Sequence, residues 1–118
     1  MNEKAKEFFM KVWGNKEYAE HAEKVKDYCL ELTKDTELNK NVFIIASWIH
    51  DLGNSRDKEN HVFESMDLLD LFMQVNPEVK EEYDEISDCI LHHTSETNPK
   101  TVYGRIFQFA ERKNRMNP

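Results

Sequence analysis

Hydrophobic positions recur at intervals of three and four residues along most of this sequence. That spacing places apolar side chains on one face of an α-helix, and no alternating run is long enough to indicate a β-sheet. We therefore predict an all-α fold, a single-domain bundle of about six helices that covers residues 1–118. The expected helices span 3–13, 16–32, 39–52, the residues after 60, 77–93 and the residues after 99.

Glycine, asparagine and proline residues separate these segments. Gly14 is suited to the left-handed turn that follows many helices, and Gly53 is expected to end the third helix. Asn60 is expected to cap the fourth helix with its side chain. Asn76 and Pro77 form an N-cap and first-turn pair, which predicts that the fifth helix starts there.

The third expected helix has the most hydrophobic sequence. Residues 42–49 are apolar almost all the way round the helix, so this helix is expected to lie at the centre of the bundle. The first helix carries Phe8, Phe9 and Trp13, and we expect it to cover the bundle rather than to contact another subunit. The oligomeric state itself is left open by the sequence.

Composition narrows the classes of partner and location. The chain has 16 basic and 23 acidic residues and a net charge of -7, which opposes bulk binding to nucleic acid or to acidic lipids. The N-terminal residues lack an apolar signal core, and no apolar run approaches the roughly 20 residues that a membrane span requires. We therefore expect a cytoplasmic protein without a membrane partner. Cys29 and Cys89 show no metal-binding spacing and are expected to be buried thiols.

The candidate chemistry lies in the histidines. Neutral imidazole and carboxylate groups are usual ligands of transition-metal ions. The chain has only five histidines, and one of them directly precedes an aspartate. They are His21, His50 (followed by Asp51), His61, His92 and His93. His93 continues the apolar stripe of the fifth helix, whereas His92 is rotated from it by about 100°. His93 is therefore the better ligand candidate of that pair.

These residues resemble the signature of the HD domain superfamily of helical, metal-dependent phosphohydrolases. The signature has a histidine on an early helix, a His-Asp doublet ending a buried helix and a late Asp in an Ala-Asp-Arg-like context. Here the matching residues are His21, His50 with Asp51, and Glu111 between Ala110 and Arg112. Many members add two histidines between the doublet and the last acid, where this chain has His61 and His93. The resemblance covers roughly residues 20–113 and includes a turn formed by Pro99, Lys100 and Thr101, which is common in compact bacterial members.

The resemblance implies a metal-dependent phosphohydrolase that acts on a small phosphomonoester or nucleotide. It implies one or two divalent ions, of Mn, Fe, Ni, Co or Zn with Mg also possible, that would activate water. The implied metal ligands are His21, His50, Asp51, Glu111, His61 and His93. Asp51 is the candidate general base, and His61 and His93 are candidates to contact the phosphate or to protonate the leaving group. Lys58, Lys100 and Arg112 are candidates to bind the substrate phosphate.

One departure from the signature leaves alternatives open. The chain has Glu111 where the family has Asp, and residues 107–109 replace a more acidic stretch. The first alternative is a ligand-binding or regulatory module that keeps the fold without turnover. The second is a di-iron oxygenase, because one branch of the superfamily uses a similar set of six ligands. For single residues, His21 and His61 could instead lie at the margin of the core, and Glu111 could be a solvated helix residue.

Overall fold

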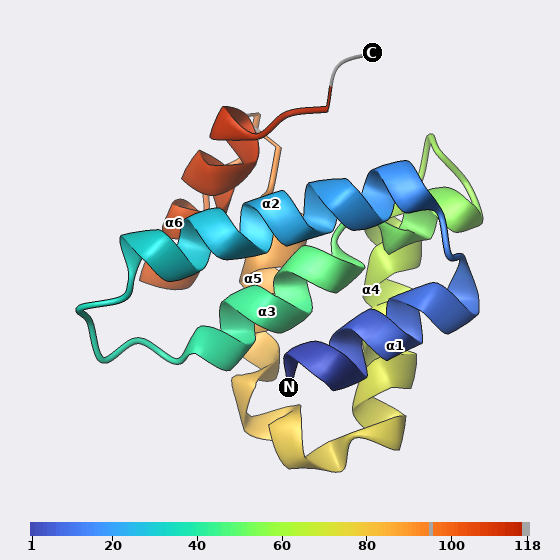
Figure 1. Ribbon diagram of the computed structural model, residues 1–118, viewed down its shortest axis with the longest axis horizontal. Coiled ribbons are helices and arrows are strands. Elements are labelled where there is room, and N and C mark those ends of the chain that lie inside the picture. Colours follow the sequence, from blue (N-terminus) through green and yellow to red (C-terminus); the bar gives the residue numbers. More distant parts are fainter. Residues whose placement is uncertain (95, 117–118) are drawn as a thin grey trace.

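Helix α3 (Lys40–Ile49) lies at the centre of the fold, where it contacts α1 (Asn2–Val12), α2 (Lys16–Leu32) and α5 (Tyr83–Leu91) (Figure 1). The computed structural model describes residues 1–94 and 96–116. The remaining elements of this part of the chain are η1 (Leu52–Ser55), α4 (His61–Val75), η2 (Pro77–Glu82) and α6 (Val102–Lys113). The two η elements are 3₁₀-helices, and no strand occurs in the described ranges. The all-α prediction and the central position of the third helix are confirmed.

The core forms around α3 because seven of its ten residues are buried: Val42, Phe43, Ile45, Ala46, Ser47, Trp48 and Ile49. A helix that is apolar on nearly all sides is stable only when neighbours cover each side. In Figure 1, α2 and α1 lie on either side of α3, and α5 crosses behind it. The C-terminal α6 packs against α2 and α5 and also contacts α3.

The first helix covers the bundle, as the sequence predicts. Ala5 and Phe9 are buried, and the Phe8 ring packs edge-on against Phe72 with centroids 5.2 Å apart. The indole Nε1 of Trp48 donates a hydrogen bond to the Asn2 Oδ1 atom at 2.8 Å, which ties the start of α1 to the central helix.

The cysteine prediction is also confirmed. Cys29 and Cys89 are both buried and neither forms a disulfide. Burial, followed by the nearby Glu111 carboxylate, raises the pKa of the Cys29 thiol to about 12. The thiol is therefore protonated at neutral pH and serves as a small apolar group in the core.

Two predicted helix ends are wrong. Helix α3 ends at Ile49, so His50 and Asp51 follow the helix instead of forming its last turn. Gly53 is not the residue that ends α3. It lies inside η1, where the backbone of α4 packs closely against it. The left-handed turn at Gly14 is confirmed by a φ of 69°.

Asn60 and Asn76 occupy the predicted N-cap positions, but neither side chain makes a capping hydrogen bond. The Asn60 amide donates to the Asp57 carboxylate at 2.9 Å, and the Asn76 amide donates to the Phe72 carbonyl at 3.1 Å. Residues Pro77–Glu82 form a 3₁₀-helix, and the α-helix itself begins only at Tyr83. The buried face predicted for this segment is nevertheless correct, since Val79, Ile86 and Ile90 are all buried.

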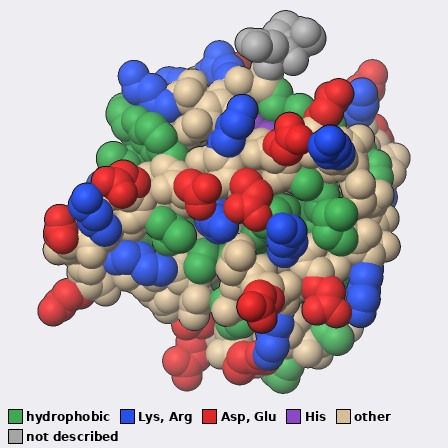
Figure 2. All heavy atoms as spheres, in the orientation of Figure 1, with side chains coloured by type: hydrophobic (Ala, Val, Ile, Leu, Met, Phe, Trp, Pro, Cys, Tyr) green, Lys and Arg blue, Asp and Glu red, His purple; other side chains and the backbone are tan. Residues whose placement is uncertain are grey.

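The surface is mixed in charge. Figure 2 shows acidic and basic side chains interspersed over one face, with hydrophobic clusters between them. In the part of the chain that the structure describes, no helix combines the length and the hydrophobicity needed to cross a bilayer.

Candidate metal centre

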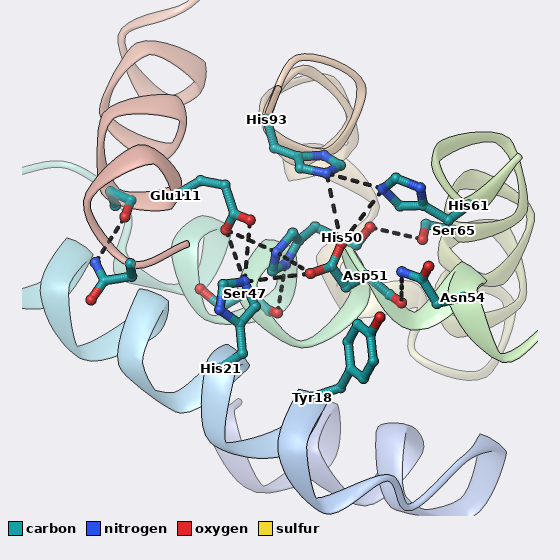
Figure 3. A network of polar contacts seen from close by, with 12 residues as sticks. Tyr18, His21, Ser47, His50, Asp51, Asn54, His61, Ser65, His93 and Glu111 are labelled. Carbon is teal, nitrogen blue, oxygen red and sulfur yellow. Dashed lines mark hydrogen bonds and ion pairs between the residues drawn. The ribbon is translucent and has the colours of Figure 1, made fainter. Parts of the chain in front are cut away.

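Four residues from three separate segments meet where α2, α3 and α6 come together. His21 comes from the middle of α2, His50 and Asp51 follow the end of α3, and Glu111 lies on α6. The His21 Nε2 atom is 3.1 Å from Glu111 Oε1 and 3.4 Å from Asp51 Oδ2. The His50 Nε2 atom is 3.0 Å from Glu111 Oε2 and 3.2 Å from Asp51 Oδ2. Figure 3 shows these side chains converging on one point.

A second group shares Asp51 with the first. His61 is the first residue of α4, and His93 follows the end of α5 by two residues. The His61 Nε2 atom lies 3.6 Å from Asp51 Oδ1 and 3.3 Å from the His93 Nε2 atom, which is 3.7 Å from the same carboxylate oxygen. One oxygen of Asp51 therefore faces the first group and the other oxygen faces the second (Figure 3).

Backbone carbonyls hold three of the imidazole rings in one orientation. The Nδ1 atoms of His50, His61 and His93 lie 2.9, 3.2 and 2.7 Å from the carbonyl oxygens of residues 47, 58 and 90. A carbonyl only accepts hydrogen bonds, so Nδ1 carries the hydrogen and donates it. The neutral ring then presents the Nε2 lone pair to the centre, which is the tautomer that a metal ligand needs.

The turn after α3 is held by a serine on α4. The Ser65 hydroxyl donates to the His50 carbonyl at 2.9 Å and accepts from the Gly53 amide at 2.8 Å. A side chain built at Gly53 would collide with the carbonyl of His61 and with the backbone of Ser65. Close packing of these two segments therefore places Asp51 opposite the start of α4. The spacing along the chain predicts that Ser65 lies on the buried face of α4, but it does not indicate this role.

The electrostatics of the first group favour a positive charge. Burial raises the pKa of Asp51, but the neighbouring His50 outweighs burial, so the pKa lies below its ordinary value. Burial also raises the pKa of Glu111, but His50 and His21 lower it more, to well below the usual range. Both carboxylates are thus ionised at neutral pH. Burial lowers the pKa of His50, yet the two carboxylates raise it more, because they stabilise a cation beside them.

The donor set and its spacing fit a divalent metal ion. Ligand atoms at about 2.0–2.2 Å from one ion are about 2.8–3.6 Å apart when the bond angles are near 90° to 110°. The contacts of the first group run from 3.0 to 3.4 Å, within that interval. Those of the second group run from 3.3 to 3.7 Å, from inside this interval to just beyond its upper end. In addition, the buried Nε2 atom of His50 has no hydrogen-bond partner of good geometry among the described residues, although two carboxylates lie beside it. A shared cation would satisfy this atom.

A cavity of about 380 Å³ opens onto both groups. Its wall includes His21, Asp51, His61, His93 and Glu111, together with residues that the sequence did not indicate as part of a site: Tyr18, Asn54, Thr94, Glu96, Arg115 and Met116. Of the three phosphate candidates, Arg112 lines this cavity, and Lys58 and Lys100 are not among its described lining residues. Lys100 instead lines a separate depression beside His92 and Asp88.

The loop that follows His93 is fixed by Gln108 of α6. The amide nitrogen of Gln108 donates to the carbonyls of His92, Thr94 and Thr97 at 3.0, 2.6 and 2.8 Å. This loop carries Thr94 to the cavity wall, so Gln108 shapes the wall without reaching the centre. In the sequence, residues 107–109 stand out only as less acidic than the matching stretch of the family. The role of Gln108 leaves no local pattern, because its hydrogen-bond partners lie in a loop distant along the chain.

Asp88 anchors the far end of the same loop. Its carboxylate accepts hydrogen bonds from the backbone amides of Lys100 and Thr101 and from the Thr101 hydroxyl, the last at 2.7 Å. Thr101 in turn caps α6 by accepting from the Gly104 amide. Helix α6, which carries Glu111, is thus tied at its start to α5.

The two adjacent histidines after α5 point in different directions, as the spacing predicts. His93 is 5% exposed and faces the second group, while His92 points towards Asp88, with its Nε2 atom 3.7 Å from the carboxylate. The structure therefore brings together all six predicted ligands, and their role in holding a metal stays a prediction.

Comparison with known proteins gives one match. The family model of the HD domain matches residues 18–116, which include all six of these residues. Neither the curated proteins nor the solved structures contain a match to the chain.

Proposed function

Because this chain belongs to the HD domain family, whose domains usually bind divalent metals, we propose that it is a metal-dependent phosphohydrolase of a small phosphomonoester or nucleotide. The observation that carries the proposal is the position of Asp51 between two groups of ligand atoms at the wall of an open cavity. A carboxylate in that position can serve two cations or one cation and a reacting water, and either arrangement can support phosphoryl transfer.

The ligands divide into two sets by position. His21, His50, Asp51 and Glu111 would hold the first ion, and His61 and His93, with Asp51, would hold a second or contact the phosphate. A divalent ion bound here supplies Lewis acidity, which lowers the pKa of water and offsets the negative charge of the phosphoryl oxygens. Its chemical identity is Mn, Fe, Ni, Co, Zn or Mg, since imidazole and carboxylate ligands suit several of these ions.

The protein's own groups would do the remaining work. Asp51 is ionised at neutral pH and can accept a proton from the attacking water. Arg112 and Arg115 bring positive charge to the cavity wall, where guanidinium groups bind phosphate oxygens in pairs. Burial, followed by the Asp51 charge, raises the pKa of Tyr18, so its phenol stays protonated and can donate a hydrogen bond into the cavity.

The Glu111 substitution does not weaken the proposal. Its two carboxylate oxygens lie 3.0 and 3.1 Å from the Nε2 atoms of His50 and His21. The longer side chain therefore reaches the position that a ligand requires. This geometry supports a site that can bind a metal ion.

The test combines metal analysis with a phosphatase screen of the full chain. Metal content is measured after reconstitution with each candidate ion, and phosphate release is measured on phosphomonoesters and nucleotides. Asp51→Asn is compared with Asp35→Asn, an exposed aspartate outside the site. We expect bound metal and metal-dependent release that Asp51→Asn abolishes and Asp35→Asn preserves.

Three results would reject this assignment. Absence of both bound metal and phosphate release would reject the metal-dependent hydrolase. Ligand binding without turnover would indicate the regulatory module, and oxygen consumption by an iron-loaded, coloured protein would indicate the oxygenase. Release that survives Asp51→Asn would remove Asp51 from its role.

A further inference from the structure

We propose that an apolar groove beside His61 receives the alkyl or aryl group of the phosphomonoester whose phosphate lies at the metal centre. The proposal rests on the proposed function and adds to it the chemical class of the substrate's second half. It also assigns Phe63, Met66 and Leu91 as residues that determine specificity.

The groove lies between the first turns of α4 and the end of α5. It encloses about 440 Å³, and its described lining consists of Glu59, Asn60, His61, Val62, Phe63, Met66 and Leu91. The side chain of Phe63 is 80% exposed and that of Leu91 is 42% exposed. Large apolar side chains in a concave surface gain free energy when a ligand excludes water from them. An apolar group is therefore the chemistry that this groove fits.

The groove and the metal centre are parts of one continuous surface. His61 lines both the groove and the cavity of the centre. The same two chain segments also supply both, because Phe63 follows His61 by two residues and Leu91 precedes His93 by two. The Nε2 atoms of His61 and His93 lie 3.3 Å apart, so the two segments are in direct contact at the boundary. A phosphate ester oriented by these histidines has the groove as a neighbouring surface.

The cavity of the metal centre differs in character from the groove. Its lining includes the polar and charged residues Arg112, Arg115, Thr94 and Glu96. A ligand with an anionic end and an apolar end matches this division, since each end meets groups of its own kind. A sugar phosphate, which is polar throughout, would leave the groove without a partner.

The test measures binding, so it does not depend on turnover. Methyl-, propyl- and hexylphosphonate are titrated calorimetrically into the manganese-reconstituted protein and its Phe63→Ala and Phe109→Ala variants. Phe109 is an exposed phenylalanine on α6 that lines neither the groove nor the cavity in the described residues, so it is the matched control. We expect affinity to rise about three- to fourfold per buried methylene until the groove is filled. Phe63→Ala should flatten this dependence, and Phe109→Ala should leave it unchanged.

Several outcomes would overturn the proposal. They are equal affinity for all three phosphonates, no binding of any of them, or a chain-length dependence that persists in Phe63→Ala. Sedimentation gives a further one: self-association that Phe63→Ala abolishes, without a chain-length effect, would assign the groove to a second copy of the chain. If the phosphonates behave as expected but no phosphomonoester is hydrolysed, the proposed function fails while the apolar subsite stands. The two failures are therefore distinguishable.

Discussion

The Nε2 atoms of His61 and His93 face each other at 3.3 Å, while the Nδ1 atom of each ring donates to a backbone carbonyl. Two imidazoles held in this way direct lone pairs at each other. Burial and the neighbouring His50 both lower the pKa of His93, which disfavours a proton on that ring. A metal ion beside both nitrogens and the Asp51 Oδ1 atom would turn this repulsion into coordination.

We therefore predict that His93→Gln and Asp51→Asn have different effects on metal binding. His93→Gln removes a ligand of the second group alone, so it should weaken one class of manganese site by about tenfold or more and spare the other. Asp51→Asn changes the ligand that both groups share and should weaken both classes. Calorimetric titration and metal analysis would measure this, with His92→Gln as the neighbouring control. Equal manganese binding by His93→Gln and the unchanged protein would count against the second group.

Glu111 gives a second prediction: the variant with the family's usual aspartate at this position should bind metal less tightly. Replacing it by Asp withdraws the carboxylate by about one carbon–carbon bond, roughly 1.5 Å. The contacts to His21 and His50, now 3.1 and 3.0 Å, would lengthen together. We expect Glu111→Asp to weaken metal binding by about tenfold, equivalent to about 1.4 kcal/mol. A chelator competition assay would compare it with Glu31→Asp, an exposed position on α2. A Glu111→Asp variant that binds metal as tightly as the original chain would show that side-chain length has no part in this site.

The sequence predicts the faces of the helices better than their ends. The three- and four-residue spacing places Ile86 and Ile90 in the core, because a helix repeats locally. His93 is also buried, although it lies two residues beyond the end of α5. The turn after α3 is held by hydrogen bonds in which the Ser65 hydroxyl accepts from the Gly53 amide and donates to the His50 carbonyl. Ser65 lies twelve positions beyond Gly53, and such a partner leaves no local pattern. Asn60 is of a residue type that often caps helices with its side chain, but its side-chain amide donates to the nearby Asp57 carboxylate.

The site shows the same limit. The histidines and Asp51 are candidate ligands by residue type alone. Glu111 and the grouping of six residues into one site follow only from the resemblance to the HD signature, because spacing along the chain does not reveal which helices meet. The role of Gln108 stayed hidden, since its three acceptors belong to an irregular loop 11–16 residues away. Arg115 reaches the cavity wall only because α6 ends beside α2.

Gln108 leads to a third prediction, on stability. Gln108→Glu keeps the shape of the side chain but replaces the donor with a carboxylate that faces three carbonyl oxygens. Lost hydrogen bonds and repulsion should lower the free energy of unfolding by about 2–3 kcal/mol, and Gln108→Ala should cost less. Urea denaturation would measure both, with Gln74→Glu on the exposed face of α4 as the control. Should Gln108→Glu be no less stable than Gln74→Glu, the amide would not be what holds this loop.

Asp88 predicts a pH dependence of stability that is separate from the metal ligands. Burial raises its pKa, but hydrogen bonds from Thr101 and Lys100 lower it more, so the pKa lies below its ordinary value. A lowered pKa means that the ionised carboxylate stabilises the fold at neutral pH. This contribution is complete above the ordinary aspartate pKa of about 3.9 and is lost as the pH falls through the lower folded value.

The measurement for Asp88 is the difference in the free energy of unfolding between Asp88→Asn and the original chain. Asp88→Asn should reduce the free energy of unfolding by about 1–3 kcal/mol at pH 7, because one acceptor oxygen and the charge are lost. The gap between Asp88→Asn and the original chain should narrow as the pH is lowered below the ordinary aspartate pKa of about 3.9. Asp84→Asn, on the exposed side of α5, should show neither effect. A gap that stays constant across this pH range would exclude ionisation of Asp88 as the source of stability.

Gly53 connects stability to the geometry of the centre. A methyl group added there would overlap the His61 carbonyl and would lie 2.6 Å from the Ser65 backbone nitrogen, so α4 must move away from η1. We expect Gly53→Ala to lower the free energy of unfolding by about 2–4 kcal/mol, as overpacking against rigid backbone does. Because His61 begins α4, the same shift should separate its imidazole from Asp51 and weaken the second metal site more than the first. Gly14→Ala is the comparison, since it strains a left-handed residue outside the centre. It should lower stability while leaving the ratio of the two metal affinities unchanged. If Gly53→Ala also leaves this ratio unchanged, the close packing at Gly53 does not determine the position of His61.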